Sequence, residues 1–176
     1  MKNFPIQSER AASRKARAAP ASWRFAWLLA APHRLGFFAG ALMMSVSALW
    51  WAALLFSQAM GHAPQMALAP TLAHALLMAL SFTPLFISGF LFTAGPKWLG
   101  LGEVSARSLQ PAVVLMLLGW LLTIIGFHWH TLLASAGVGL VTAGWTRLCL
   151  KFIALLRQSR MARLSLTPQR NTHSFG

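Results

Sequence analysis

Residues 35–57 read LGFFAGALMMSVSALWWAALLFS, a run of 23 residues without one charged side chain. At about 1.5 Å per residue, an α-helix of this length reaches roughly 35 Å, enough to cross a hydrocarbon core of about 30 Å. A secretory signal peptide is the competing interpretation, but its apolar segment has only roughly 7 to 15 residues. The run therefore predicts an uncleaved transmembrane helix.

Three further apolar runs follow, at residues 71–94, 111–127 and 132–156. Pro84 lies inside the first of these and should kink its helix, because proline removes a backbone donor. We therefore expect an all-α membrane protein, a four-helix transmembrane bundle that occupies residues 34–156.

The flanking segments are polar and basic. Residues 1–21 are rich in Ala, Ser and Arg, a composition that predicts a disordered cytoplasmic tail. Residues 22–33 combine Trp, Phe and Arg, which favours an interfacial helix leading into the membrane. Residues 157–176 predict a second basic tail in the cytoplasm.

The overall composition indicates lipid as the solvent of this chain. Of its 176 residues, 57% are hydrophobic and 10% are charged, whereas soluble domains average about 25% charged residues. The formal net charge of +13 comes from basic residues in tails and loops between the apolar runs. We expect these residues to contact anionic lipid head groups, and we expect no nucleic-acid partner.

The basic residues also predict the orientation of the bundle. All 15 Lys and Arg residues precede the first helix, lie between the second and third, or lie from the end of the fourth onward. The other two connections, residues 58–70 and 128–131, contain none. The positive-inside rule then places both termini in the cytoplasm of a bacterial-type inner membrane, with the uncharged connections facing the periplasm.

Four of the six histidines fall near the predicted periplasmic boundary, accompanied by several methionines. Imidazole with thioether is a ligand set that suits copper or haem iron. The alternative is that these histidines are amphipathic interface residues and that the methionines only fill apolar space. The candidate metal ligands are His62, His74, His128, His130, Met60, Met66 and Met78.

Motifs of soluble enzymes are absent from the sequence. There is no P-loop, no GxGxxG and no GxSxG, and no carboxylate lies within a predicted span. The missing intramembrane carboxylates argue against a proton relay or a cation transporter. We therefore predict no catalytic residues; the sequence favours a protein that is not an enzyme but leaves an enzymatic activity open.

The second apolar run carries a family resemblance. Residues 74–78 read HALLM and residues 87–100 read ISGFLFTAGPKWLG. Together they resemble the signature of the NnrS family, in which His-Ala-His-Glu-Met opens a helix and Ala-Gly-Phe-Leu-Leu-Thr-Ala-Val-Pro-Asn-Trp-Thr-Gly closes it. Residues 32–38, PHRLGFF, are also similar to the opening of that family. The resemblance covers about residues 30–130.

The resemblance implies a haem- and copper-containing membrane protein linked to denitrification and to the response to nitric oxide. His74 matches the first His of the family motif, whereas Leu76 and Leu77 stand where the second His and the Glu would be. The chain is also much shorter than typical members. It would be a reduced homologue, a truncated reading frame, or a subunit that completes its site by forming a homo-oligomer or by joining a membrane partner.

Three functions remain open on the sequence. The first is a protein that binds haem through His74, with His128 or His130 as second axial ligand, or that binds copper through the His and Met set. The second is a non-catalytic membrane scaffold or assembly partner, favoured by the missing His-Glu pair. The third is a subunit of a small-molecule transporter, for which four helices are few.

Overall fold

A computed structural model of the chain describes residues 25–166, which form helices and short connections without a strand. Five α-helices and two short 3₁₀ helices follow one another along the chain. Their bounds are η1 (Phe25–Ala30), α2 (Pro32–Ala59), α3 (Pro70–Leu80), α4 (Thr83–Trp98), η2 (Ala106–Ser108), α5 (Gln110–Trp129) and α6 (Thr131–Leu166).

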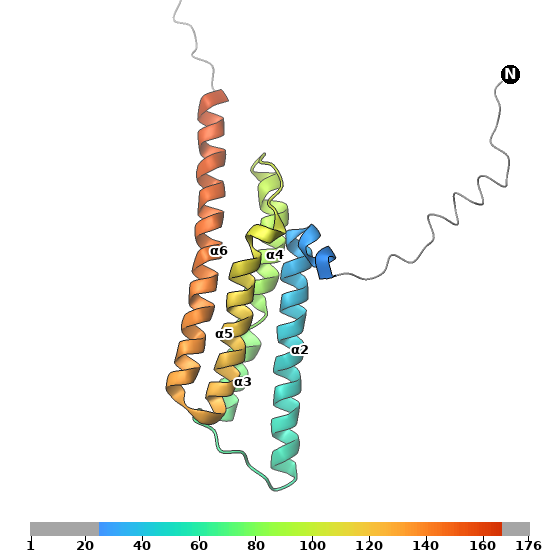
Figure 1. The fold of residues 1–176 in the computed structure, drawn as a ribbon, viewed down its shortest axis with the longest axis vertical. Helices are drawn as coiled ribbons and strands as arrows, with labels where there is room; N and C mark the ends of the chain where they lie inside the picture. The colour runs from blue at the N-terminus through green and yellow to red at the C-terminus, as the bar shows by residue number, and fades with distance from the viewer. Residues whose placement is uncertain (1–24, 167–176) are drawn as a thin grey trace, which may run out of the picture.

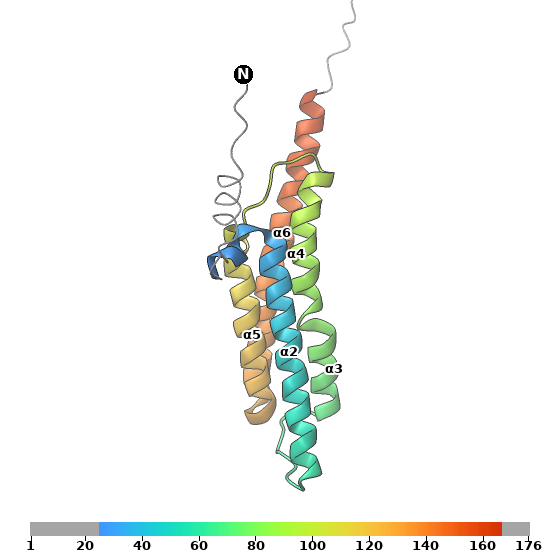
Figure 2. The ribbon, with the colours of Figure 1, turned by 90° about the vertical axis from the view of Figure 1, so that its right-hand side faces the viewer.

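These helices confirm the expected number of membrane-spanning segments. Four stretches in the described part of the chain are long and apolar enough to cross a membrane: α2, α3 together with α4, α5, and most of α6. The four segments run alongside one another, with α3 and α4 stacked end to end as one interrupted span (Figures 1 and 2). An all-α bundle follows, as the four apolar runs predict.

Prolines mark where the spans begin. A proline lies at the first or second position of each of four helices: Pro32 in α2, Pro70 in α3, Pro84 in α4 and Pro111 in α5. Proline is suited to this place because its missing N–H would be unpaired there in any case and its fixed φ is already helical. The sequence therefore sets the starts of these four helices locally.

Glycines at positive φ follow the ends of two helices. Gly61 (φ 79°) follows α2, and Gly100 (φ 68°) follows α4. After α4, the N–H of Leu101 donates to the carbonyl of Pro96 and the N–H of Gly100 donates to that of Lys97. This is the Schellman motif, which satisfies the last carbonyls of a helix. The prediction that the second span ends at residue 94 is therefore wrong, because the helix continues past Pro96 to Trp98.

The kink expected in the second span is an interruption between α3 and α4, at which Ser81 and Phe82 keep helical φ and ψ. The helix stops at Leu80 and restarts at Thr83, so two helices replace the single one predicted over residues 71–94. Pro84 cannot donate a hydrogen bond to the carbonyl of Leu80, and its ring crowds that carbonyl. The interruption therefore lies just before the proline.

Helix α6 is longer than its apolar run. It reaches Leu166, so the predicted end at residue 156 is wrong, and Arg157, Arg160 and Arg163 lie on a helix and not in an irregular tail. Its 36 residues correspond to about 54 Å, well beyond a hydrocarbon core of about 30 Å. Figure 1 shows α6 extending past the other helices.

The predicted interfacial helix at residues 22–33 is represented by η1, which has only six residues. It packs beside the start of α2 and beside η2. The predicted disordered tail at residues 1–21 lies outside the described residues.

Small residues bring the helices together in two antiparallel pairs. In the α2–α4 pair, a Cβ added at Gly36 would come within 2.5 Å of the Cα of Gly89, and one at Gly40 would overlap the ring of Phe86. Gly119 of α5 approaches Gly137 of α6 just as closely. The GxxxG motif at Gly36 and Gly40 therefore makes the close helix contact that it predicts.

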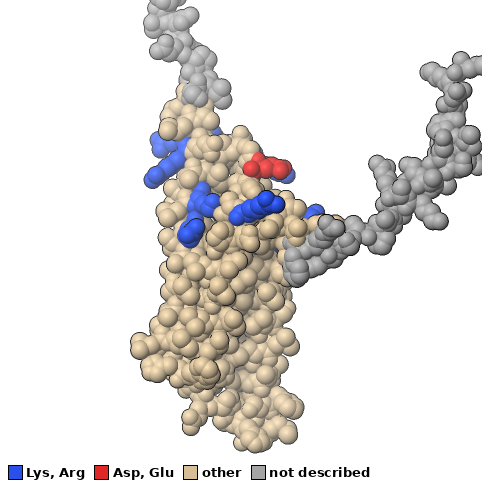
Figure 3. Space-filling view, viewed as in Figure 1, with Lys and Arg blue, Asp and Glu red and all other residues tan. Residues whose placement is uncertain are grey.

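Charged side chains gather at one end of the bundle. The described basic residues lie at the start of α2, the end of α4, in η2 and in α6 from Arg147 onward. Figure 3 shows basic and acidic atoms at this end and none over the rest of the visible face. We call it the charged end, and the opposite end the uncharged end. Two polar–apolar boundaries are thus separated by an apolar body, as expected of a membrane protein.

Candidate functional site

The uncharged end holds the candidate ligands that the sequence singled out. It consists of the 60–69 connection, the start of α3 and the α5–α6 turn. The N–H of Ala67 donates to the carbonyl of Phe127 at 2.8 Å, which ties the long connection to the end of α5. Segments far apart in the sequence thus meet at this end of the bundle.

His74 is the candidate ligand with an uncommitted nitrogen. Its ring stacks on the Trp51 ring, with centroids 4.1 Å apart and planes 12° from parallel. Its Nδ1 atom is buried without a hydrogen-bond partner. Leaving a buried polar atom unpaired costs about 1–3 kcal/mol. A metal ion at such a nitrogen would gain a coordination bond without breaking any existing hydrogen bond.

One ring nitrogen of His128 is already hydrogen-bonded to a side chain of a neighbouring helix. Trp50 of α2 donates its indole N–H to Nε2 of His128 at 2.9 Å. A neutral imidazole that accepts at Nε2 carries its proton on Nδ1. Binding a metal at Nε2 would break the Trp50 bond, and binding at Nδ1 would bring two N–H groups together. Metal ligation by His128 and its bond to Trp50 therefore exclude one another.

His130 serves the turn between α5 and α6. It is the single residue between these helices. Its Nδ1 accepts the N–H of Leu132 at 3.2 Å, and its carbonyl accepts the N–H groups of Leu133 and Ala134. These bonds satisfy the first free donors of α6, as a helix cap does. The same tautomer argument applies here, because a metal on either ring nitrogen would disturb this cap.

The remaining candidate ligands are spread over the 60–69 connection and α3. Met60 and His62 are exposed beside Gly61, and Ser57 donates its hydroxyl proton to the carbonyl of His62. Met66 is half-buried against the apolar core, and Met78 is half-buried on α3. The structure therefore brings these residues to one end of the bundle without joining them in a common site.

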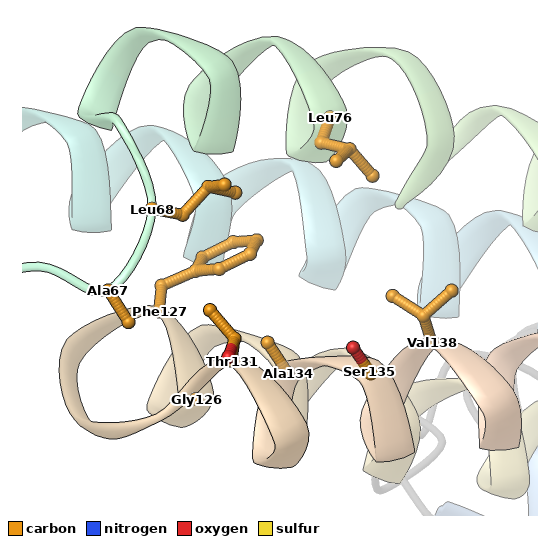
Figure 4. Close-up of a pocket in the computed structure, with 9 residues that line it drawn as sticks. All are labelled: Ala67, Leu68, Leu76, Gly126, Phe127, Thr131, Ala134, Ser135 and Val138. Atoms are coloured by element: carbon orange, nitrogen blue, oxygen red, sulfur yellow. The ribbon is translucent and has the colours of Figure 1, made fainter.

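A cavity of about 270 Å³ opens between α3 and the α5–α6 hairpin. Leu76, Phe127 and Val138 contribute to its apolar wall, and the hydroxyls of Thr131 and Ser135 are its polar side-chain groups (Figure 4). Leu76 is the position at which the family motif has its second histidine. Here the side chain offers only apolar surface to the cavity. No imidazole lines this space.

The donors at the uncharged end fit a haem iron or a copper ion in part. Within residues 25–166, no three His, Cys, Asp or Glu side chains lie close enough together to hold a metal ion. The fit rests on His74 alone, since its buried nitrogen is unpaired, whereas His128 and His130 are already engaged. A second ligand would have to come from a thioether, a rearranged histidine or another chain.

Two tryptophans of this region contact candidate ligands, which the sequence did not predict. Trp50 and Trp51 look like members of an aromatic belt at the membrane boundary. The structure instead pairs Trp50 with His128 and Trp51 with His74. No local pattern connects these positions, since the contacts join α2 to α5 and α3.

Comparison with known proteins agrees with the resemblance and extends it. The family model described as NnrS protein matches residues 27–169, which includes α6 and so reaches further than the 30–130 segment expected from the motifs. Neither a curated protein nor a solved structure matches the chain. Since the family match covers most of the chain, this helical membrane protein belongs to the NnrS family.

Proposed function

We propose that this protein binds haem or copper through His74 near the periplasmic face of the inner membrane, as part of the response to nitric oxide in denitrifying cells. The observation that carries the proposal is the buried, unpaired Nδ1 of His74. Membership of the NnrS family supports the choice of cofactor. A bound haem iron or copper would supply a centre able to take up a small ligand such as nitric oxide.

The residues around His74 would orient its ring. Trp51 covers one face of the imidazole at 4.1 Å, which limits rotation of the ring. Ala73 and Leu77, on either side in α3, are fully buried and fix this part of the helix against the core. A ligand held in this way needs little reorganisation to bind a metal.

Optical spectroscopy with metal analysis tests the proposal. The full chain is purified from cells supplied with haem precursor and, separately, with copper. We expect a Soret band or stoichiometric copper in the wild type and its loss in His74→Ala. His33→Ala, which removes an imidazole at the charged end, is the matched control and should keep the cofactor. An unloaded wild type, or equal loading of His74→Ala, contradicts the proposal.

Methionine variants separate haem from copper. Thioethers are soft ligands that favour Cu(I). If copper binds, Met66→Leu and Met78→Leu should each lower the copper content without reducing helicity, while a haem site held by His74 would keep its Soret band. Leucine conserves the volume of both half-buried side chains, so packing is preserved.

The periplasmic placement has its own test. Alkaline phosphatase folds only outside the cytoplasm, so a fusion after Pro64 should be active and a fusion after Gly102 should be inactive. These positions lie at the uncharged and charged ends of the bundle, respectively. The reverse pattern would place His74 on the cytoplasmic side and reject the orientation.

A non-catalytic scaffold is the second candidate, and one observation favours it. Leu77, at the position of the Glu in the family motif, is fully buried in the apolar core, so this position contributes to packing and not to a site. This function predicts that His74→Ala, His128→Ala and His130→Ala all leave co-purification of two differently tagged copies intact. Gly40→Leu, which would separate α2 from α4 at Phe86, should abolish it.

A further inference from the structure

A second cavity lies at the charged end, away from all candidate metal ligands. It measures about 140 Å³ and is enclosed by the end of η1, the start of α2, the end of α4 and the 101–104 segment. Gly100 turns the chain back at positive φ, so this segment closes over the start of α2. The cavity is several times the roughly 30 Å³ that one water occupies in the liquid, so a group of several heavy atoms can enter it.

The cavity has an apolar wall and a charged rim. Pro32, Phe92 and Pro96 are buried wall residues, and Lys97 and Glu103 are exposed side chains that also line it. Glu103 is the only carboxylate in the described residues, and no ion pair joins it to Lys97 or to any other residue of this part of the chain. A cation and an anion therefore border one cavity without forming an ion pair with each other.

One wall of the cavity is fixed by hydrogen bonds. The N–H of His33 donates to Oγ1 of Thr93 at 3.0 Å, and Thr93 in turn donates to the carbonyl of Gly89 at 2.9 Å. The first bond holds the start of α2 against α4, and the second, within α4, fixes the Thr93 hydroxyl, so the cavity is built into the fold. Its level along the bundle is that of the basic residues, where lipid phosphates lie in a membrane.

We propose that this cavity binds a phosphate ester that carries a primary ammonium group, supplied by the head group of a membrane aminophospholipid. Lys97 would pair with the phosphate and Glu103 with the ammonium, while the apolar wall receives the adjoining glycerol carbons. Glu103 disfavours a purely anionic head group by like-charge repulsion. A choline head group cannot donate hydrogen bonds to the carboxylate, and Phe92 alone does not make an aromatic cage for it. This inference does not rest on haem or copper binding.

Native mass spectrometry of the purified full chain tests the proposal. The protein is mixed with equal amounts of phosphatidylethanolamine, phosphatidylcholine and phosphatidylglycerol with matched acyl chains. We expect the wild type to retain phosphatidylethanolamine about two- to fivefold over phosphatidylcholine, a modest preference because exposed ion pairs contribute little. Equal retention of these two lipids would overturn the proposal.

Three variants make the test specific. Glu103→Gln should abolish the preference for phosphatidylethanolamine. Non-specific charge attraction would have the opposite effect, because this substitution makes the protein more positive and would strengthen the binding of lipid phosphates. Lys97→Ala should lower retention of all three lipids, whereas Lys151→Ala, which removes a cation from α6 outside the cavity, should not. An unchanged preference in Glu103→Gln, or equal losses in the two lysine variants, would overturn the proposal. So would competition by free phosphoethanolamine at the same concentration as the lipid, since that result would identify a soluble ligand.

Discussion

The two helix pairs of this bundle are built differently, although small residues join both. In the α5–α6 pair, backbone meets backbone at several levels, at Gly119 with Gly137 and at Gly126 with Ala134. The α2–α4 pair has one such contact, between Gly36 and Gly89. At Gly40, the nearest atoms of the partner helix belong to the Phe86 ring, and the backbone carbonyl of Phe82 lies 3.3 Å from an added Cβ.

The two helix pairs also differ in the length of the segment that joins their helices. A single residue, His130, joins α5 to α6, whereas ten residues and the whole of α3 lie between α2 and α4. Few contacts link one pair with the other. The α5–α6 hairpin is therefore a local unit whose close packing follows from its own sequence, and the α2–α4 pair depends on contacts between distant residues.

Among the substitutions that test this difference between the helix pairs, the largest loss of stability is expected at Gly126. An added Cβ would overlap the backbone of Ala134, which cannot move aside without opening the one-residue turn. Gly126→Ala should destabilise the protein by about 3 kcal/mol, the upper part of the range for overpacking. SDS-induced unfolding of the purified protein, followed by tryptophan fluorescence, measures this loss.

Gly139 provides the matched control on the other helix of the hairpin. No atom lies within 4 Å of a Cβ added there. Because alanine is a better helix former than glycine by about 1 kcal/mol, Gly139→Ala should leave stability unchanged or raise it. Similar losses at Gly126 and Gly139 would mean that α5 and α6 are not closely packed.

The α2–α4 pair should respond more weakly and unevenly. Gly36→Ala would force its Cβ against the backbone of Gly89, and we expect a loss of about 2 kcal/mol. Gly40→Ala meets the Phe86 ring at Cδ2 and Cε2, and a side chain stacked on Phe37 can yield more than backbone can, so the cost should be lower, about 1 kcal/mol. The same unfolding assay ranks the two variants, and a larger effect at Gly40 would reject this assignment.

Features that depend on residues within one segment could be predicted from the sequence, and features that depend on contacts between distant residues could not. The four spans could be read from apolar runs and from prolines at helix starts, because both act within one segment. The small residues of α6 do not all face its partner helix: Ala134 and Gly137 meet α5, but Ala136 and Gly139 are exposed. Successive helical residues point about 100° apart, so one set of neighbours cannot all share a face.

Other features depend on tertiary contacts that no local pattern contains. The continuation of helix α6 beyond residue 156 is an exception, because the good helix formers that extend it lie within the segment itself. At the uncharged end, the sequence selected histidines by residue type. It could not show that Trp50 donates to His128, that the α5–α6 turn uses His130, or that His74 is the one candidate ligand with a buried and unpaired nitrogen.

The bond between Trp50 and His128 is one of the few links between the two pairs. Trp50→Phe keeps an aromatic ring but removes the donor, and should cost about 1 kcal/mol. It should also speed the reaction of His128 with diethyl pyrocarbonate, since Nε2 is no longer shielded by the indole N–H. Trp129→Phe, which alters an exposed ring, is the control. An unchanged reaction rate in Trp50→Phe would show that this link is absent.

The smallest effect is expected at the break within the second span. Ser47 of α2 donates to the carbonyl of Met43 at 2.7 Å and shares a further hydrogen bond of 3.1 Å with Ser81, just after α3. Ser81→Ala removes only the interhelical bond and leaves Ser47 paired, so the loss should be about 0.6 kcal/mol, the average for such bonds in membrane proteins. Ser47→Ala removes both bonds and should cost no less. A loss in Ser81→Ala as large as that in Gly36→Ala would show that α2 is held to its neighbours by polar contacts and not by the close approach of glycines.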